Sequence, residues 1–251
     1  AIQGGFEQFS LNYQPFVDRD RKITGAEALL RWNHPSSGLI SPSRFIPIAE
    51  QNGSIRFIGQ WTLYRACRQL KAWHNSGFEN LNISINLSPS QFKQPDLADR
   101  VNGILESVKL SGASLKLELT ETTIMEDPED AIATMNQLRE QGHTMSLDEF
   151  GTGYSSLSYL RRFPIDTLKI DLCFVSDVDT NPAKQEIVKA MIAMARSFGM
   201  QTLAEGVERE AELEFLIAQG CDYIQGYYFS RAVPESEFNT LLSTADVFAN
   251  T

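Results

Sequence analysis

The sequence predicts a single α/β domain, a modified TIM-type (β/α)8 barrel whose first strand runs against the others. Three observations lead to this fold. The chain has 251 residues, the usual length of one such barrel. After the second of about eight strand-like segments, strands alternate with helical segments, which is typical of a parallel sheet covered by helices. The polar turn at 18–22 is too short for a crossover helix, so the first two strands must be antiparallel if they pair.

The expected elements follow from the spacing of apolar residues. We predict strands at 9–17, 23–32, 82–87, 115–119, 144–147, 167–170, 201–204 and 223–225. We predict helices at 55–73, 91–108, 128–142, 182–199, 209–219 and 234–243. Ser54 is the expected N-cap of the first helix, and Asp127 and Asn181 each precede a proline that starts another. Periodicity alone leaves an open doubly wound sheet as the alternative.

The composition excludes several classes of function. A net charge of −10 argues against a polymeric nucleic acid as partner, because such binding depends on clustered Lys and Arg. No apolar run approaches the ~20 residues of a membrane span, so we expect no membrane contact by this domain. Cysteines at 67, 173 and 221 match no metal or redox spacing and are expected to be reduced and buried, as in the cytoplasm. The chain starts without Met, so we expect a fragment of a longer protein, in which segments outside this sequence can provide a membrane anchor.

Polar residues recur within or just after the predicted strands, where unpaired charge is costly. They are Glu27, Asn86, Glu118, Glu121, Asp148, Glu149, Lys169, Asp171, Glu205, Glu208 and Gln225. The C-terminal ends of barrel strands converge on one face, where barrel enzymes work. Oxygen ligands suit Mg²⁺ or Mn²⁺, and the adjacent acids at 148 and 149 suggest two metals, which together would clamp a phosphodiester. Each residue taken singly is more often a helix cap, a turn residue or a surface ion-pair partner.

The segment 148–156 predicts a mobile active-site loop. Gly151 and Gly153 permit backbone turns, and small hydroxyl residues at 152, 155 and 156 can tie the loop down. A Gly-x-Gly on its own is commonly just a turn. Arg31 follows Glu27 by four residues and so shares its face of the strand, where it would grip a phosphate or form a surface salt bridge. The three histidines form no ligand spacing and are expected to be structural.

An ordered series of motifs runs through nearly the whole chain: Tyr-Gln-Pro at 13–15, Glu-Ala-Leu-Leu-Arg-Trp at 27–32, Phe-Ile-Pro-Ile-Ala-Glu at 45–50, Asn-Leu-Ser at 86–88, Glu-Leu-Thr-Glu at 118–121, Phe-Gly-Thr-Gly-Tyr-Ser-Ser at 150–156, Lys-Ile-Asp at 169–171, Ala-Glu-Gly-Val-Glu at 204–208 and Gln-Gly-Tyr-Tyr-Phe-Ser-Arg at 225–231. The series resembles the EAL domain family, the cyclic di-GMP phosphodiesterases of bacterial signalling. The resemblance implies one EAL domain over residues 1–251 and hydrolysis of cyclic di-GMP to linear pGpG by a metal-activated water, with two Mg²⁺ or Mn²⁺ ions.

The resemblance also implies a role for each matching residue. The expected metal ligands are Glu27, Asn86, Glu118, Asp148, Glu149 and Glu205, with Asp148 bridging the two ions. Glu27, Lys169 and Glu205 are the expected catalytic residues, Lys169 contacting the nucleophilic water and Glu205 acting as general base or water ligand. The expected substrate contacts are Gln14, Leu29, Arg31, Asp171 and Gln225. Glu121 and Glu208 are expected to anchor the active-site loop.

One position departs from the family pattern, which usually reads Asp-Asp-Phe-Gly where this chain has Asp148-Glu149-Phe-Gly. The extra methylene moves a carboxylate by roughly an ångström, and misplacement on that scale can cost about a hundredfold in rate unless the loop absorbs it. A catalytically impaired sensor that only binds cyclic di-GMP is therefore the alternative function. An enolase-like metal enzyme with a lysine base is a third. The resemblance further implies a homodimer and upstream sensor or GGDEF domains.

Overall fold

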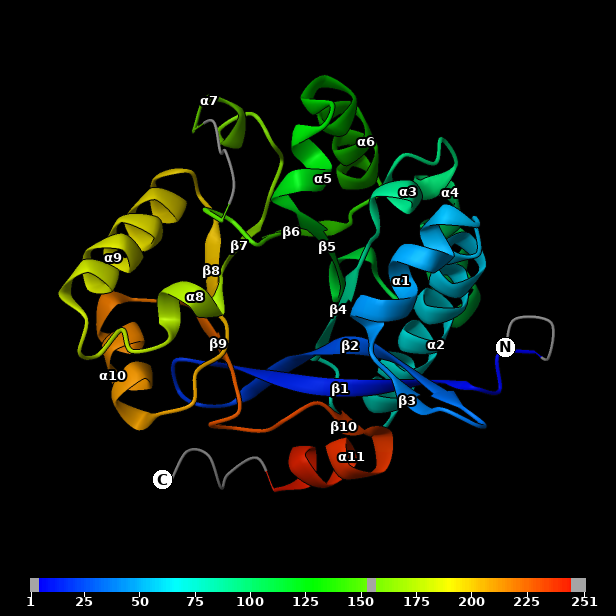
Figure 1. Ribbon diagram of the computed structural model, residues 1–251, viewed down its shortest axis with the longest axis horizontal. Helices are drawn as coiled ribbons and strands as arrows, with labels where there is room; N and C mark the ends of the chain where they lie inside the picture. The colour runs from blue at the N-terminus through cyan, green and yellow to red at the C-terminus, as the bar shows by residue number, and fades with distance from the viewer. Residues whose placement is uncertain (1–4, 153–156, 245–251) are drawn as a thin grey trace.

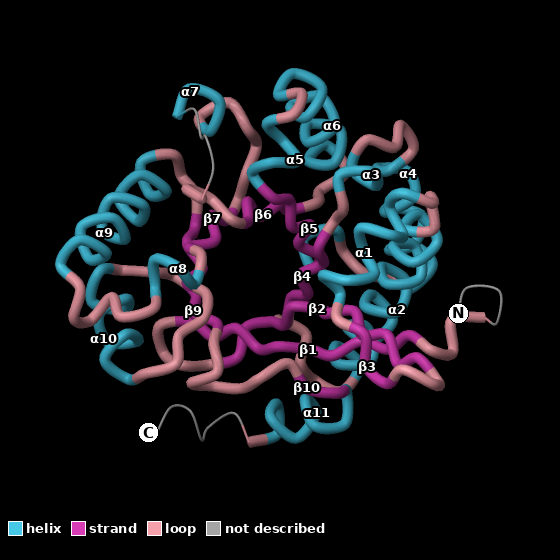
Figure 2. The backbone as a smooth tube through the Cα atoms, in the orientation of Figure 1, coloured by secondary structure: helices cyan, strands magenta, loops and turns pink. Residues whose placement is uncertain are grey.

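The computed structural model describes residues 5–152 and 157–244, which form a closed ring of eight strands with helices around it (Figures 1 and 2). The barrel strands are β1 (Phe9–Asp18), β2 (Ile23–His34), β4 (Asn82–Asn86), β5 (Leu115–Thr120), β6 (Thr144–Asp148), β7 (Thr167–Ile170), β8 (Gln201–Ala204) and β9 (Tyr223–Gln225). β1 pairs antiparallel with both β2 and β9, and the other neighbours in the ring are parallel. The predicted barrel and its antiparallel first strand are confirmed, and closure of the ring excludes the open sheet.

Helices follow most of the strands and cover the outside of the ring (Figure 2). They are α1 (Pro42–Gln51), α2 (Ile55–Asn75), α3 (Pro89–Phe92), α4 (Leu97–Val108), α5 (Glu121–Met125), α6 (Pro128–Glu140), α7 (Leu157–Leu160), α8 (Leu172–Val175), α9 (Pro182–Ser197), α10 (Glu210–Gln219) and α11 (Glu235–Ser243), with a 3-10 turn at Gly112–Ser114. The short strands β3 (Gly38–Ile40) and β10 (Val233–Pro234) extend the sheet beyond the ring. None of the helices in the described part of the chain has the length and apolar character needed to cross a membrane.

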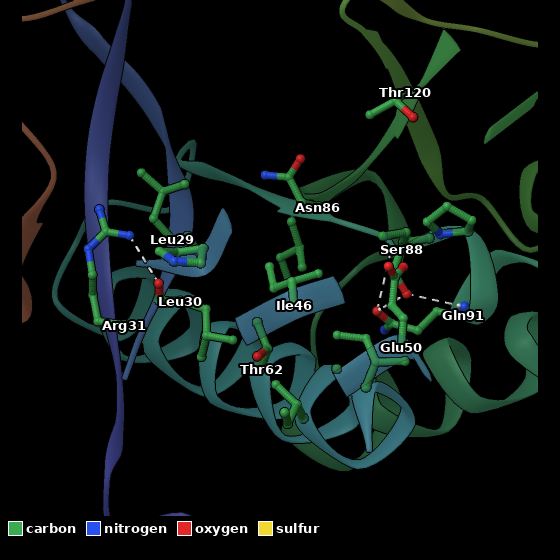
Figure 3. A pocket seen from close by; sticks show the side chains of 18 of the residues that line it. Leu29, Leu30, Arg31, Ile46, Glu50, Thr62, Asn86, Ser88, Gln91 and Thr120 are labelled. Carbon is green, nitrogen blue, oxygen red and sulfur yellow. Dashed lines mark hydrogen bonds between the residues drawn. The ribbon is translucent and has the colours of Figure 1, made fainter. Parts of the chain in front are cut away.

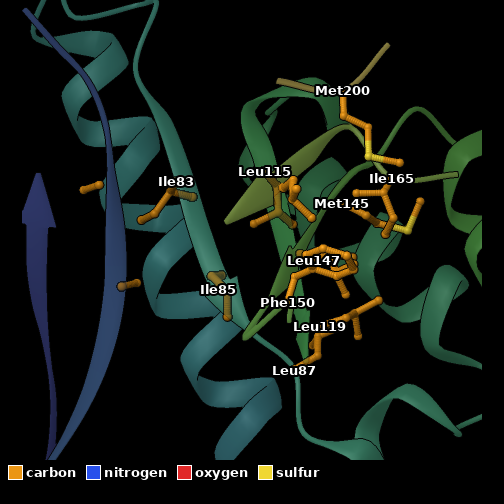
Figure 4. Packing of buried hydrophobic residues seen from close by; sticks show 14 of the residues in the cluster. Ile83, Ile85, Leu87, Leu115, Leu119, Met145, Leu147, Phe150, Ile165 and Met200 are labelled. Carbon is orange, nitrogen blue, oxygen red and sulfur yellow. The ribbon is translucent and has the colours of Figure 1, made fainter. Parts of the chain in front are cut away.

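On β5 an apolar outer face alternates with a polar inner face, which helps to place the site. On β5, Leu115, Leu117 and Leu119 are fully buried in the apolar layer under the helices, and Figure 4 shows Leu115 and Leu119 among its members. Lys116 and Glu118 alternate with them and point into the barrel, because successive strand residues face opposite sides. Lys116 reaches across the lower interior to the ring of Tyr223, 4.8 Å from its centroid. β5 therefore contributes to the interior two charged groups that need partners.

The hairpin β1–β2 is set by its turn. The Oδ1 of Asp18 accepts hydrogen bonds from the backbone N–H groups of Asp20 and Lys22, both at 2.9 Å, and so stabilises the tight reversal. The register then pairs Gln14 with Glu27, which brings the Tyr-Gln-Pro motif at 13–15 and the Glu-Ala-Leu motif at 27–29 to the same level of the barrel. A local sequence signal thus fixes where Glu27 stands.

Several predicted elements need correction. The expected helix 91–108 is two helices, α3 and α4, because Pro95 cannot continue a helix and disfavours helical backbone in the residue before it. α1 was not predicted at all, since Pro47 lies inside it. Ser54 stands at the start of α2 but its side chain makes no capping bond, whereas Asp127 and Asn181 cap their helices as predicted. Cys173 is exposed rather than buried.

Candidate active site

A buried lysine stands at the centre of the predicted cluster. The Nζ of Lys169 on β7 donates to Glu118 Oε2 at 2.7 Å and to Asp148 Oδ2 at 3.0 Å, and forms an ion pair with Glu205 Oε1 at 2.8 Å. These carboxylates come from the ends of β5, β6 and β8. Lys169 is 1% exposed and Glu118 2%. Four side chains from four strand ends, far apart in the sequence, therefore meet at one point.

Glu27 belongs to the same site through two amides. Its Oε1 accepts from the Nδ2 of Asn86 at 2.7 Å, and its Oε2 accepts from the Nε2 of Gln225 at 2.8 Å. Glu27 is 6% exposed, and both of its oxygens have a donor. The predicted residues of β2, β4 and β9 thus hold one another in place beside the Lys169 cluster.

The electrostatics of the cluster are dominated by burial and like charge. Burial raises the pKa of Glu118 to about 8, against the attraction of Lys169, with Glu27 and Asp148 raising it further. Burial likewise raises the pKa of Glu205 to about 7, again opposed by Lys169 and reinforced by Asp148 and Glu27. Burial alone would lower the pKa of Lys169, but the surrounding carboxylates raise it well above its ordinary value. Lys169 therefore stays protonated, and the raised pKa values of Glu118 and Glu205 reflect a site that holds more carboxyl groups than one ammonium can balance.

A divalent metal fits this donor set by its chemistry. The strand ends offer carboxylate and amide oxygens, which Mg²⁺ and Mn²⁺ prefer, and a further cation would relieve the burial and repulsion that raise the pKa values of Glu118 and Glu205. As the side chains lie, the described part of the chain holds no group of three or more acidic, His or Cys residues arranged around a metal position. The ammonium of Lys169 stands among them instead.

The loop after β6 is tied to the barrel by Glu121. The Oε2 of this buried side chain accepts from the backbone N–H of Gly151 at 3.0 Å, and Gly151 has the positive φ, +86°, that favours glycine. The hydroxyl of Thr152 donates to the carbonyl of Glu149 at 2.7 Å. Glu149 is exposed and adopts φ +56°, a region in which Glu is uncommon. The loop positions 153, 155 and 156, for which we predicted mobility, lie outside the described residues.

Two cavities flank the cluster. The larger, about 460 Å³, lies between the ends of β2 and β4 and the helices α1 and α2, and includes Leu29, Arg31, Asn86 and Glu149 in its lining (Figure 3). The smaller, about 260 Å³, is bordered by Gln14, Glu27, Leu29, Glu205, Gln225 and Tyr227 among others. Leu29 lines both cavities. The Glu27–Gln225 pair therefore stands at the wall of one cavity, with Asn86 opening into the other.

Comparison with known proteins decides the family. Residues 1–232 match the profile of the family described as the EAL domain. The chain belongs to the EAL domain family. Over 229 residues it is 43% identical to the cyclic di-GMP phosphodiesterase NbdA of Pseudomonas aeruginosa, covering 91% of this chain and 29% of NbdA. It therefore spans under a third of that relative, and 34% of the bifunctional diguanylate cyclase/cyclic di-GMP phosphodiesterase MucR of the same organism, at 42% identity.

Solved structures agree with the fold of this EAL domain. The phosphodiesterase PaMucR in complex with c-di-GMP matches with a TM-score of 0.89 and 41% identity, covering 94% of this chain and 97% of that chain. The EAL enzyme Bd1971 in its cGMP-bound form matches with a TM-score of 0.90 and 36% identity, covering 96% of this chain and 67% of that one. The expected resemblance to the EAL family is confirmed.

The other residues predicted to contact the substrate differ in the hydrogen bonds that they make within the EAL domain. Arg31 forms no ion pair with any described residue; its Nη1 donates to the carbonyl of Leu30 at 3.0 Å, so the salt-bridge alternative is not realised (Figure 3). Gln14 donates through Nε2 to the carbonyl of Ser230 at 3.2 Å. Asp171 caps α8 by accepting from the N–H of Cys173 at 2.8 Å. Arg31 therefore keeps donors available to a ligand, and Asp171 uses its Oδ1 to cap α8.

One residue that organises the site was not predicted. Glu212, buried in α10, accepts from the N–H groups of Asp177 and Glu208, each at 3.0 Å, and so joins the loop after β7 to the loop after β8. Arg209 reinforces the junction by binding both Glu212 and Asp179. Glu208, expected to be an anchor, has an exposed side chain, and its backbone is the part that is held. The only sequence signal for this was an acid in the first turn of a helix, which is common.

Proposed function

We propose that this EAL domain hydrolyses cyclic di-GMP to linear pGpG with the help of Mg²⁺ or Mn²⁺. The observation that carries the proposal is the cluster of Glu27, Glu118, Asp148 and Glu205 around Lys169, next to Arg31 and between two cavities. A mixed set of buried acids and one cation has little structural purpose at an open barrel end, where solvent-facing loops suffice for stability. The names of NbdA and MucR agree with a phosphodiesterase.

The metal ligands in this proposal are Glu27, Asn86, Glu118, Asp148, Glu149 and Glu205. Bound among them, two Mg²⁺ or Mn²⁺ ions would supply the positive charge that activates water and stabilises the transition state of phosphodiester hydrolysis. Glu149 is the proposed ligand at which this chain departs from the usual family pattern. Its backbone is in the left-handed region, and the residue lines the larger cavity. Although the side chain is exposed, partial desolvation and then repulsion by Asp148 and Asp171 raise its pKa, and a cation there would relieve that repulsion.

The protein's own groups have separable tasks. Lys169, held protonated by its neighbours, orients the attacking water and stabilises charge developing on the phosphate. Glu205, with a pKa of about 7, accepts a proton from that water near neutral pH, the range in which a general base works best. Arg31 grips a phosphate with its planar fork. Glu121 keeps the loop of Glu149 in place through Gly151.

The shape of the site suits a substrate with two halves. Cyclic di-GMP carries two guanosine units joined through two phosphates. The cavities of about 460 and 260 Å³ share Leu29 in their walls, and in this proposal each base occupies one recess while the phosphates cross the carboxylate cluster. Ligand pockets of a few hundred cubic ångströms are typical for small molecules. Gln14 and Gln225 in the smaller recess, like Arg31 in the larger, supply the polar contacts.

The proposal is tested by steady-state hydrolysis of cyclic di-GMP with Mg²⁺, Mn²⁺ or chelator, the product separated by chromatography. Activity should require a metal, and Glu27→Ala should abolish it while the matched variant Glu186→Ala, on the exposed surface of α9, leaves it unchanged. Retained activity in Glu27→Ala would remove Glu27 from the ligand set. Tight nucleotide binding without turnover would favour the second candidate, a binding module. The observation behind this candidate is the positive φ of Glu149, a backbone conformation that is uncommon for Glu.

Assembly and location are further parts of the proposal. We expect the domain to form a homodimer and to act in the cytoplasm beside sensor or GGDEF domains of a longer polypeptide. MucR, which combines two activities by name and is about three times as long, supports the multidomain arrangement. The three cysteines are unpaired, in keeping with a reducing compartment.

A further inference from the structure

Helix α2 presents a surface that the catalytic proposal does not use. Along its 21 residues it carries Arg56, Arg65, Arg68 and Lys71 and no acidic residue, in a chain whose net charge is −10. The inner face of the helix packs against the barrel and α4, with Leu63, Ala66, Cys67 and Leu70 among its buried residues. Figure 1 shows α2 on the outside of the ring, on the side where the described N-terminal segment begins. The positive charge of this helix therefore faces outward.

The outward residues form one continuous face. Phe57, Tyr64, Arg68 and Lys71 are spaced so that they follow one another along the helix, a stripe about 21 Å long at 1.5 Å per residue. Phe57 is 61% exposed and Tyr64 40%, which is unusual for large aromatic side chains. The guanidinium of Arg68 lies 5.7 Å from the ring centroid of Tyr64. We call this stripe, with the flanking Arg56 and Arg65, the α2 basic face.

The cations of this face lack acidic partners. None of the four forms an ion pair within the part of the chain that the structure describes, although arginines elsewhere do so repeatedly. Arg56 is close enough to Asp96 to lower its pKa, but the ion pair of Asp96 is with Arg100. On one helix of an acidic protein, four positive charges without an ion-pair partner among the described residues repel one another and attract an external anion. Charge complementarity thus points to an acidic partner.

The exposed aromatic residues indicate that the partner carries apolar side chains as well as acidic ones. The strip of α2 next to this face is already covered: Phe6, in the described N-terminal segment, stacks on Trp61 with centroids 5.8 Å apart and planes 14° apart. A segment with apolar side chains can continue that cover onto Phe57 and Tyr64 while its acids meet the arginines. An anionic membrane is less suitable, because insertion needs a broad apolar face and that of α2 is buried against the barrel.

We propose that the α2 basic face docks an acidic amphipathic helix of a protein partner. Apolar side chains of that helix pack on Phe57 and Tyr64, and its carboxylates pair with Arg65, Arg68 and Lys71. The opposite side of α2 contributes Ile58, Gly59 and Thr62 to the larger cavity, so the partner lies one helix diameter, roughly 10 Å, from that cavity. Docking here does not depend on hydrolysis.

The test uses the domain and a labelled synthetic helix of about 18 residues, with Leu at helical spacing on one face and Glu on the rest, a length that covers the stripe. Fluorescence anisotropy measures its affinity for the wild type, for Arg65→Glu/Arg68→Glu and for Phe57→Ser/Tyr64→Ser. The matched control is Ile187→Ser/Lys189→Glu on α9, which also pairs an exposed apolar residue with a lysine. Circular dichroism establishes that each variant is folded.

We expect both α2 variants to bind the helix at least about tenfold more weakly, the control variant to bind normally, and added salt to weaken wild-type binding, since exposed ion pairs are screened. A scrambled peptide of the same composition should bind poorly. Failure of the wild type to bind the amphipathic helix would overturn the proposal, as would equal binding by the α2 variants. Binding of phosphatidylglycerol vesicles with the same dependence on Phe57 and Arg68, in place of the peptide, would also overturn it.

Discussion

Replacement of Lys169 by Met probes the charge balance on which the site depends. The substitution keeps an unbranched side chain but removes the ammonium that contacts Glu118, Asp148 and Glu205 at 2.7 to 3.0 Å. Breaking a buried ion pair from one side typically costs 3–5 kcal/mol, because the remaining charge is left uncompensated. For a domain of this size each kcal/mol lowers Tm by about 2–4 °C, so we expect a fall of roughly 6–20 °C at pH 8.

The pH dependence of this loss has a definite sign. The pKa values of Glu118 and Glu205, about 8 and about 7, lie above the ordinary value of 4.5 that applies to the unfolded chain. A carboxyl group of this kind favours folding below pH 4.5 and loses that contribution as the pH rises through 7 and 8. Without Lys169 the carboxylates keep protons to still higher pH, so the variant should lose less Tm at pH 6 than at pH 8.

The assay is thermal unfolding by circular dichroism at pH 6 and pH 8, in chelator and in Mg²⁺ or Mn²⁺. A bound cation should replace part of the missing charge, so metal should raise the Tm of Lys169→Met more than that of the wild type. The reasoning is refuted if Tm is unchanged at pH 8 in chelator, or if the loss is greater at pH 6. Lys189→Met, on the surface of α9, is the control and should change Tm by at most about 2 °C.

Three further predictions concern the loop and the metals. Glu149→Asp should raise turnover at saturating Mn²⁺, by up to about a hundredfold, because Asp tolerates positive φ better and restores the shorter carboxylate. Glu121→Ala should lower kcat by about tenfold or more through loss of the bond to Gly151, while Glu121→Gln keeps an acceptor and loses less. Apparent metal affinity, measured by titration calorimetry, should rise from pH 6 to pH 8 as Glu118 and Glu205 lose their protons.

Each of these has an outcome that contradicts it. Slower turnover in Glu149→Asp would mean that the loop has adapted to the longer side chain. Equal kcat in Glu121→Ala and the wild type would show that the bond to Gly151 does not position the loop. Metal affinity that stays constant between pH 6 and 8, with no proton release in buffers of different ionisation enthalpy, would place ligation outside the buried carboxylates.

The architecture was predictable because it depends on local signals. The short turn after β1 forces antiparallel pairing, and Pro128 and Pro182 mark helix starts that the structure reproduces. Pro95 carried an equally clear signal, but the apolar periodicity continues across it and predicted one helix where there are two. α1 could not be predicted, since its helix contains Pro47 and forms through packing of Phe45 with Phe9 and Trp32.

The sequence predicted which residues lie at the site, but not which of them contact one another. Strand-end acids stood out in the sequence because charge is costly in a barrel strand. That Lys169 would lie between Glu118, Asp148 and Glu205 depends on side chains up to 51 residues away from it in the sequence, which no local pattern encodes. Glu212 was missed for the same reason, because its partner Asp177 lies 35 residues away and becomes a neighbour only when two loops meet.

Single-turnover conversion of cyclic di-GMP, with protein in excess and Mn²⁺ present, tests the central claim most directly, because it separates hydrolysis from binding. The account predicts complete conversion of the bound nucleotide to pGpG by the wild type, with intact cyclic di-GMP remaining in Glu27→Ala and in chelator. Recovery of intact cyclic di-GMP from a wild-type protein that has bound it, with Mn²⁺ and with Mg²⁺, would contradict the account and identify the domain as a sensor.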